Sequence, residues 1–426
     1  MSSHNVAQAG TDTTPTLDLL FVSPRFLFPV DSGGKIRTTQ TLRGMKRAGN
    51  FRITLLSPAP VNANADFSDE LAAVCDRFVS WPESAQSRWH NVTRLRHALS
   101  SLPIPVATDC SNEGSRLVQQ ELAKNPSVVV FDFAHAAVLA PANLSVPSVM
   151  FTHNVEAEIF ARHVQVAKNP LAKMAWQSQY KKLLRFEKTA LQKFDSVVAV
   201  SKRDRQVFEE DWGIANVADI STGVDLDFFN YEPPKQGGGV VFTGSMDWLA
   251  NIDGIEFLLD DIWPIVAQKM PSLEMTVVGR NPPQSLVSTA DKSNYPWHFT
   301  GFVDDVRPYV HKSSVYVIPL RVGGGTRLKV FEAMAMGSPI VSTALGVEGL
   351  PLEEGTHYLR AETPNEFAEA VLKLAQDPVL GRQISEAAYE LVEQHFSFEV
   401  AAGEFEQVCL QTVESANNPS SQVIAQ

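Results

Sequence analysis

Short apolar runs that alternate with helical patterns constrain the fold of this chain more than any other feature. Leu17–Ser23 reads LDLLFVS, and similar runs recur at 53–56, 128–131, 149–152 and 197–200. Apolar runs of about four to eight residues are typical of buried strands. Strands that alternate with helices form βαβ units. We therefore expect a doubly wound α/β domain with a parallel sheet.

A segment rich in proline and glycine, Tyr231–Gly239 (YEPPKQGGG), interrupts this alternation. After it the pattern restarts with VVFTG, MTVVG, HFTGF, VYVIPL and PIVST. We therefore predict two Rossmann-like α/β domains that face each other across a cleft. The expected organisation is a disordered extension at 1–16, an N-terminal domain at 17–220 completed by a C-terminal helix at 396–415, a linker at 221–239, a C-terminal domain at 240–395 and a flexible tail at 416–426.

Charge and cysteine content exclude several classes of protein. The formal net charge of −12 argues against a nucleic-acid-binding protein, which needs a basic surface. The three cysteines have no CxxC spacing, so they offer no zinc site and fit reduced thiols. Neither a signal peptide nor a membrane-spanning run of roughly 20 apolar residues is present in the sequence. These features favour a cytoplasmic protein.

The segment Arg321–Thr343 (RVGGGTRLKVFEAMAMGSPIVST) carries the strongest chemical signal. A predicted strand leads into three glycines at 323–325, and a helix is predicted from about Thr326 to Met336. Glycines let backbone N–H groups approach an anion, and a helix N-terminus attracts negative charge. In open parallel sheets, ligands bind where a strand leads into a helix. The segment therefore predicts a phosphate site.

The charged residues of this predicted helix fit a nucleotide. Arg327 and Lys329 place two cations in the first turn, where the helix dipole disfavours them, and two phosphates would explain their presence. Glu332 lies six residues after Thr326, roughly 9 Å along the helix, which suits hydrogen bonds from ribose hydroxyls. The alternative is that Lys329 and Glu332 form a surface pair and that the glycines make only a tight loop.

Two weaker signals lie in the first half of the chain. Gly33 and Gly34 precede a predicted helix at 35–47 and could also meet a phosphate or a sugar. His153 directly follows the predicted strand 149–152, which places it at the ligand-binding edge of the sheet. Considered alone, a histidine at this place is typical of a packed residue.

Together these segments resemble the family-4 retaining glycosyltransferases, the glycosyl transferases group 1, which have the two-domain GT-B fold. The stretch GGGTRLKVFEAMAMGSPIVST is similar to the signature of that family. FTHNVE, VAVSKRD, STGVD, VVGR and the GG loop after FVSP add support, and the resemblance runs in order from Leu17 to about Ser415.

The resemblance implies a role for each matching residue. Glu332 would bind the ribose of a nucleoside-diphosphate sugar, and His153 would contact a hydroxyl of the reacting sugar. Arg327 and Lys329 would stabilise the leaving diphosphate, so that neither a metal ion nor another cofactor is needed. Donor-binding residues of the glycine loops would be Gly33, Gly34, Gly325, Thr326, Arg327 and Leu328. We expect Glu156 to be a helix N-terminal carboxylate rather than an acid/base group.

The sequence departs from the family pattern in two places. Gly324 stands where many members have a glutamate that touches the transferred sugar, so the identity of the sugar stays open. Ser245 and Asn251 stand near the places of an arginine and a lysine, and our hypothesis is that Arg327 and Lys329 supply this charge instead. These departures leave two alternatives, a catalytically impaired nucleotide-sugar-binding protein and a nucleotide-sugar epimerase of GT-B architecture.

The resemblance predicts transfer of a hexose-type sugar, with retention of configuration, to a glycan or lipid-linked acceptor in polysaccharide or glycoconjugate biosynthesis. A predicted helix at Leu171–Phe194 is basic and carries interleaved aromatic residues, which is typical of a helix that lies on an anionic membrane. Such a contact would place the protein on the inner face of the plasma membrane. The alternative, which the pattern slightly favours, is a solvated helix whose apolar side packs on the core.

Overall fold

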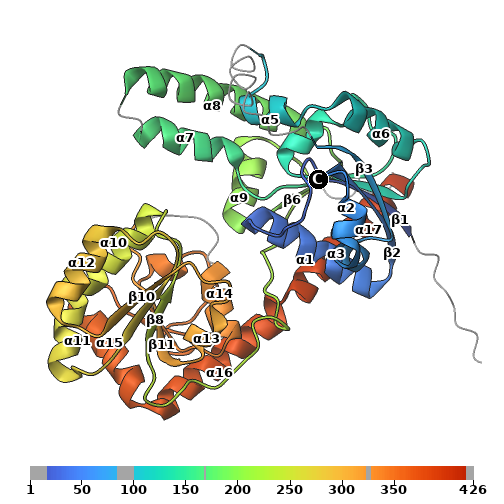
Figure 1. Cartoon of the computed structure of the whole chain (residues 1–426). Coiled ribbons are helices and arrows are strands. Elements are labelled where there is room, and N and C mark those ends of the chain that lie inside the picture. The colour runs from blue at the N-terminus through green and yellow to red at the C-terminus, as the bar shows by residue number, and fades with distance from the viewer. Residues whose placement is uncertain (1–16, 84–99, 167–168, 323–327, 419–426) are drawn as a thin grey trace, which may run out of the picture. The chain divides into compact units, whose positions relative to one another are not determined.

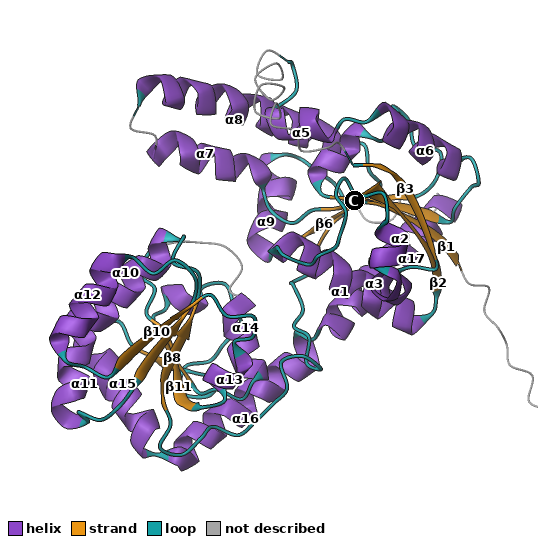
Figure 2. Cartoon of the chain, in the orientation of Figure 1, coloured by secondary structure: helices purple, strands orange, loops and turns teal. Residues whose placement is uncertain are grey.

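The structure, a computed structural model, describes residues 17–83, 100–166, 169–322 and 328–418 (Figure 1). The chain divides into two compact units. Unit 1 comprises Met1–Ser221 and Ala401–Gln426, and unit 2 comprises Thr222–Val400. Each unit contains a parallel sheet with helices on both faces (Figure 2), which confirms the predicted pair of α/β domains.

The sheet of unit 1 has the strand order β3-β2-β1-β4-β5-β6-β7, and every named pair is parallel. Its described strands are β1 (Leu17–Val22), β2 (Phe51–Ala59), β3 (Arg77–Pro82), β4 (Val128–Asp132), β5 (Ser148–Phe151), β6 (Ser196–Ala199) and β7 (Val217–Asp219). The described α-helices that lie in this unit or reach it are α1 (Gly33–Ala48), α2 (Ala63–Asp66), α3 (Ser68–Val74), α5 (Ile104–Asp109), α6 (Asn112–Leu122), α7 (Glu156–Val166), α8 (Pro170–Leu191), α9 (Lys202–Gln206) and α17 (Phe398–Asn417).

Alternate residues of the central strands build two cores. Leu19 and Phe21 of β1 pack with α1, α3 and α17, whereas Leu20 and Val22 pack with α6 and α8 on the other face. This division follows from the two-residue period of a strand. The C-terminal helix α17 thus returns to unit 1, where the ring of Phe405 lies 4.6 Å from that of Phe151.

Unit 2 repeats this plan with the strand order β10-β9-β8-β11-β12-β13. Its described strands are β8 (Gly239–Thr243), β9 (Met275–Val278), β10 (Trp297–Gly301), β11 (Ser313–Ile318), β12 (Ile340–Ser342) and β13 (Leu359–Arg360). Its described α-helices are α10 (Leu249–Phe257), α11 (Trp263–Lys269), α12 (Gln284–Ser293), α13 (Arg307–Val310), α14 (Leu328–Ala335), α15 (Pro364–Gln376) and α16 (Pro378–His395). Val240 and Phe242 face α10, α11, α12 and α15, while Val241 faces α14 and α16.

The structure adds elements that the apolar pattern does not predict. Strands β3 and β13 lie at sheet edges and are largely exposed, and β7 is an edge strand of three residues, so none forms a long apolar run. The helical segment after β8 begins at Leu249, and a π-type turn at Leu258–Ile262 divides it into α10 and α11. Within the described helices, none combines the length and the apolar character that crossing a bilayer requires.

Candidate active site

Three neighbouring strands of unit 1 bring the predicted residues Gly33, Gly34 and His153 together with Asp132, which was not predicted. Helix α1, which begins with Gly33 and Gly34, follows β1; Asp132 ends β4; and His153 stands two residues after β5. Strands β1, β4 and β5 are adjacent and parallel, so their carboxyl ends meet at one edge of the sheet. This edge is where ligands bind in doubly wound sheets.

Asp132 and His153 form a buried pair. Nε2 of His153 lies 2.7 Å from Oδ1 of Asp132. The Ser23 hydroxyl donates to Oδ2 of the same carboxylate over 3.0 Å, and the Thr38 hydroxyl donates to both of its oxygens. Burial lowers the pKa of His153 below its ordinary value, although the charge of Asp132 acts in the opposite direction. The imidazole is therefore neutral at neutral pH.

The packing around residue 34 leaves room only for glycine. A Cβ atom at this position would lie 2.6 Å from Cζ of Phe133 and 3.8 Å from Cγ of His153, so a larger residue would displace the phenyl ring. Phe133 itself has a φ of 64°, a value that residues with a side chain rarely adopt. Its ring lies 4.0 Å from the imidazole of His153. Gly33, by contrast, has open space where a Cβ would stand.

Arg37, in the first turns of α1, is buried rather than exposed to a ligand. Its guanidinium donates to the backbone carbonyls of Thr152, Ala199 and Ile220 and lies over the ring of Phe151. Burial lowers its pKa to about 9. Arg37 therefore joins the carboxyl ends of β5, β6 and β7 and has a structural role.

In unit 2, Lys329 connects the helices that follow two adjacent strands, β11 and β8. It lies on α14, which follows β11, and its Nζ donates over 3.0 Å to Oδ1 of Asn251, a residue of α10 after β8. The ammonium also lies 4.5 Å from the centre of the Phe242 ring. A Cβ at Gly244 would lie 2.9 Å from this nitrogen, so the glycine leaves room for the lysine.

Glu332 lies one turn after Lys329 on the same helix. Its side chain keeps some contact with solvent, yet the surrounding protein raises the pKa of its carboxyl to about 7, because burial outweighs the attraction of Lys329. Within the described part of the chain, its carboxylate has no hydrogen bond and no ion pair. A hydroxyl donor from a ligand would favour its ionised form.

Two polar residues of the segment after β8, Ser245 and Asn251, are both bonded to cations from the segments that follow other strands. Asn251 accepts from Lys329, and the Ser245 hydroxyl accepts from Nε of Arg280 over 3.2 Å. Arg280 follows β9 and also pairs with Asp247 at 2.7 Å. Arg280 and Lys329, which follow the two neighbours of β8 in the sheet, thus reach the segment that carries Ser245 and Asn251.

Two protein-family models match this chain. The model described as Glycosyltransferase Family 4 matches residues 32–228, and the model described as Glycosyl transferases group 1 matches residues 237–377. The first range contains Gly33, Gly34 and His153, and the second contains Lys329 and Glu332. The chain belongs to the family-4 glycosyltransferases.

Among curated proteins, the chain is similar to a phosphatidyl-myo-inositol mannosyltransferase of Mycobacterium leprae. The two are 28% identical over 207 residues, which cover 46% of this chain and 54% of the relative. The chain therefore spans about half the length of the relative it matches.

Solved structures show the same fold at low sequence identity. Sucrose-phosphate synthase from Thermosynechococcus elongatus superposes with a TM-score of 0.64 at 17% identity, covering 94% of this chain and all of the other. Anabaena HepE in complex with UDP superposes with a TM-score of 0.63 at 14% identity, covering 93% of this chain and all of the other. Both likenesses confirm the predicted GT-B type of architecture.

Some residues predicted for this family-4 site lie outside the described part of the chain. They are Gly325, Thr326 and Arg327, together with Gly324. Leu328 is the first residue of α14 and is partly buried. The donor-binding and catalytic roles of all these residues stay predictions.

Sequence reasoning missed three residues of the candidate site. Asp132 ends a buried strand, and its place beside His153 follows from the pairing of β4 with β5, which no local pattern reveals. Phe133 follows it and packs on Gly34. Arg280 lies in the VVGR segment that resembles the family, but its partner Ser245 lies in the segment that follows a different strand, β8. The sequence signal that could have identified these three residues is their position at or just after the end of a strand, where ligands bind in such sheets.

Glu156 begins α7 and lies in its first turn, so it is a helix N-terminal carboxylate as predicted. The carboxylate of Glu187, on α8, accepts hydrogen bonds from the backbone N–H groups of Glu156 and Ala157 at 3.0 and 2.7 Å, so Glu187 satisfies the start of α7. Glu187 is buried, and burial raises the pKa of its carboxyl to about 8. The carboxylate of Glu156 thus lies in the first turn of α7, and the carboxylate of Glu187 accepts from the first two backbone N–H groups of this helix.

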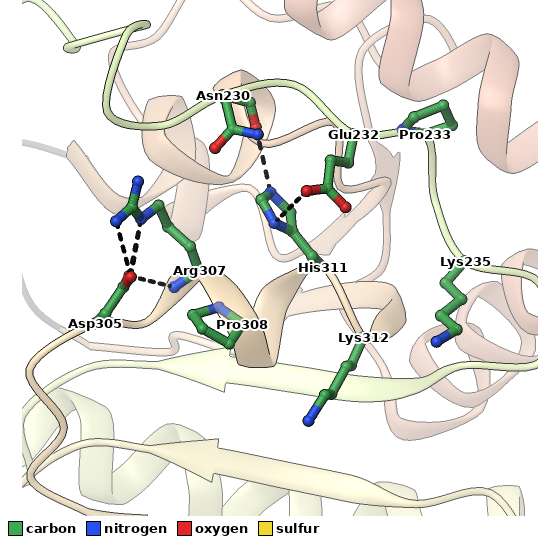
Figure 3. Close-up of a pocket in the computed structure, with 9 residues that line it drawn as sticks. All are labelled: Asn230, Glu232, Pro233, Lys235, Asp305, Arg307, Pro308, His311 and Lys312. Carbon is green, nitrogen blue, oxygen red and sulfur yellow. Dashed lines mark hydrogen bonds and ion pairs between the residues drawn. The ribbon is translucent and has the colours of Figure 1, made fainter.

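A cavity of about 650 Å³ in unit 2 lies away from this site (Figure 3). The lining residues come from two segments that precede β8 and β11 in the chain, and they are Asn230, Glu232, Pro233, Lys235, Asp305, Arg307, Pro308, His311 and Lys312. The cavity therefore lies at the amino edge of the sheet, whereas Lys329 and Glu332 follow the carboxyl edge. His311 joins its two walls by contacts to Asn230 and Glu232. In the described ranges, no group of three or more His, Cys, Asp or Glu residues is arranged to hold a metal ion.

Proposed function

We propose that this protein transfers a hexose-type sugar from a nucleoside-diphosphate sugar to a glycan or lipid-linked acceptor, with retention of configuration. The observation that carries the proposal is the arrangement of Lys329 and Glu332 on α14, with Lys329 bonded to Asn251 in the segment after β8. A cation and a carboxylate one turn apart offer a site for a phosphate and a ribose.

Departure of the nucleoside diphosphate is the step that this arrangement assists. Negative charge develops on the leaving phosphate, and preorganised donors stabilise such charge in the transition state. Lys329 supplies one ammonium, and Arg327 and the backbone of Gly325 and Thr326 supply further donors. Glu332 accepts hydrogen bonds from the ribose and so orients the nucleotide. In this proposal no metal ion and no other cofactor takes part, and activity survives treatment with EDTA.

In this proposal Gly33, Gly34 and His153 of unit 1 bind the sugar of the donor. Helix α1 begins with Gly33 and Gly34. Because glycine has no side chain, the backbone N–H groups at this helix start can approach a phosphate or a sugar. His153 contacts a hydroxyl of the reacting sugar, and the neutral state of its imidazole suits a hydrogen bond. The acceptor hydroxyl approaches the face of the sugar that the diphosphate leaves, so the anomeric configuration is retained.

The acceptor class draws support from the curated relative, whose name describes mannosyl transfer to phosphatidyl-myo-inositol. Helix α8 presents Leu171 and Met174 to solvent, with side chains 75% and 70% exposed, beside Lys173 and Lys181. Apolar and basic side chains on one exposed helix suit an anionic membrane. These features support our proposal that the protein acts in the cytoplasm, in peripheral contact with the inner face of the plasma membrane, in polysaccharide or glycoconjugate biosynthesis.

Nucleotide screening followed by product analysis tests the proposal. A thermal-shift screen with UDP, GDP, ADP and dTDP sugars should give one strong shift, because ligand at 100 times its Kd adds about 2.7 kcal/mol. Incubation with that donor alone should then release free sugar and nucleoside diphosphate slowly, and NMR of a transferred product should show the anomeric configuration of the donor. Binding without hydrolysis or transfer would support an impaired binding protein, and interconversion of sugars would support an epimerase.

A further inference from the structure

The contacts of Asp132 give the two nitrogens of His153 different roles. Both oxygens of this carboxylate accept hydrogen bonds from hydroxyls, since Ser23 donates to Oδ2 and Thr38 to both oxygens. Oδ1 also lies 2.7 Å from Nε2 of His153. A carboxylate that accepts from its neighbours also accepts from the imidazole, so Nε2 carries the proton of the neutral ring.

Nδ1 is then the nitrogen without a proton, and it can only accept a hydrogen bond. This atom is buried and has no hydrogen-bond partner among the described residues. Buried polar atoms are nearly always paired, so an unpaired acceptor at the carboxyl edge of a sheet indicates a partner that a ligand supplies.

We propose that Asp132 is a positioning residue, which fixes the tautomer and the orientation of His153 so that Nδ1 accepts a hydrogen bond from a hydroxyl group of the sugar donor. This inference rests on the proposed function, because a sugar supplies the hydroxyl. Phe133 lies against the imidazole and against Gly34, and its side chain is only partly buried.

The tautomer of His153 is measurable without any substrate. Imidazole nitrogen shifts in ¹⁵N NMR spectra distinguish Nε2–H from Nδ1–H. The wild-type protein should show the Nε2–H form, with Nδ1 unprotonated. In Asp132→Asn, the amide can donate to Nε2, so the Nδ1–H form should appear. A wild-type ring with its proton on Nδ1, or an unchanged tautomer in the variant, would overturn the proposal.

Kinetics separate positioning from a merely structural role. Asp132→Asn should lower kcat by roughly 10²-fold or more, as expected for a wrong tautomer, with a smaller change in KM. In a His153→Gln background the same change should cause no further loss, because Asp132 acts through His153. Losses that multiply in the double variant would show that Asp132 acts independently of the histidine.

A second aspartate–histidine pair in unit 1, in which His135 is buried and Asp109 is partly buried, provides the control. Nδ1 of His135 lies 3.4 Å from Oδ2 of Asp109. Asp109→Asn makes the same chemical change in another aspartate–histidine pair and should leave kcat within about threefold of wild type. Where Asp132→Asn does not fold, the wild-type NMR tautomer decides the question. Absence of donor binding and turnover in the wild-type protein would refute the proposed function, whereas the NMR result tests Asp132 by itself.

Discussion

Lys329 donates a hydrogen bond to Oδ1 of Asn251, so a cation from the helix after β11 is held at the segment that follows β8. The amide oxygen carries no formal charge, and this bond therefore orients the ammonium without neutralising it. The geometry agrees with the hypothesis that Lys329 supplies charge that many family members carry in the loop after β8.

Replacing Lys329 by alanine should lower kcat by about 10²-fold, because a preorganised donor to the leaving diphosphate is lost. The side chain is only partly buried, so thermal stability should change little. Steady-state kinetics with the nucleotide sugar and a thermal melt check both statements. Lys312→Ala is the matched control, because this lysine lines the cavity at the amino edge of the same sheet. A wild-type kcat in Lys329→Ala would refute the role.

Gly34→Ala should destabilise unit 1 by about 1–3 kcal/mol, because the new methyl group would overlap the ring of Phe133. Chemical denaturation measures this cost. In a Phe133→Ala background most of the penalty should disappear, since the ring that causes the overlap is gone. Gly33→Ala is the control, because a Cβ there meets open space. Equal losses at the two glycines would contradict the packing argument.

Nucleotide binding should release a proton from Glu332. Its pKa of about 7 in the folded protein lies above the ordinary 4.5, so its contribution to stability falls as the pH rises through this interval. Ribose hydroxyls that donate to the carboxylate favour its ionised form, so affinity for the nucleotide should rise from about pH 5.5 to 7.5.

Calorimetry in two buffers of different ionisation enthalpy counts the released protons. Glu332→Gln has no such proton to lose. Its affinity for the nucleotide should be weaker, and the pH dependence of that affinity should follow only the ionisation of the nucleotide itself. Equal proton release by both proteins at about pH 6 would show that Glu332 does not meet the ligand.

The exposed apolar residues of α8 should decide whether the protein binds anionic vesicles. Leu171→Asp combined with Met174→Asp should reduce cosedimentation with vesicles that contain phosphatidylglycerol by about tenfold, since two apolar side chains that can enter the interface are replaced by charges. Val61→Asp changes an apolar side chain that is 99% exposed elsewhere in unit 1 and should have no effect. Wild-type protein that stays in the supernatant would refute the contact.

Buried strands and helix ends were predictable because they depend on local patterns. The run VVVFD forms β4, and Gly337, a residue type that tolerates positive φ, follows the end of α14 with a φ of 74°. The partners of Lys329 and His153 were not predictable in this way. Asn251 precedes Lys329 by 78 residues, and Asp132 precedes His153 by 21, so neither contact leaves a periodic signal.

By itself, the sequence determined that the chain forms two parallel α/β domains and which strand ends carry the polar residues, because short-range hydrophobic periodicity controls both. Only the tertiary structure decided which strand ends become neighbours. The adjacency of β1, β4 and β5 places Asp132 and Phe133 beside His153 and Gly34, and it buries Arg37 among backbone carbonyls. Strand order depends on how helices pack over the whole sheet, and that packing is a long-range property.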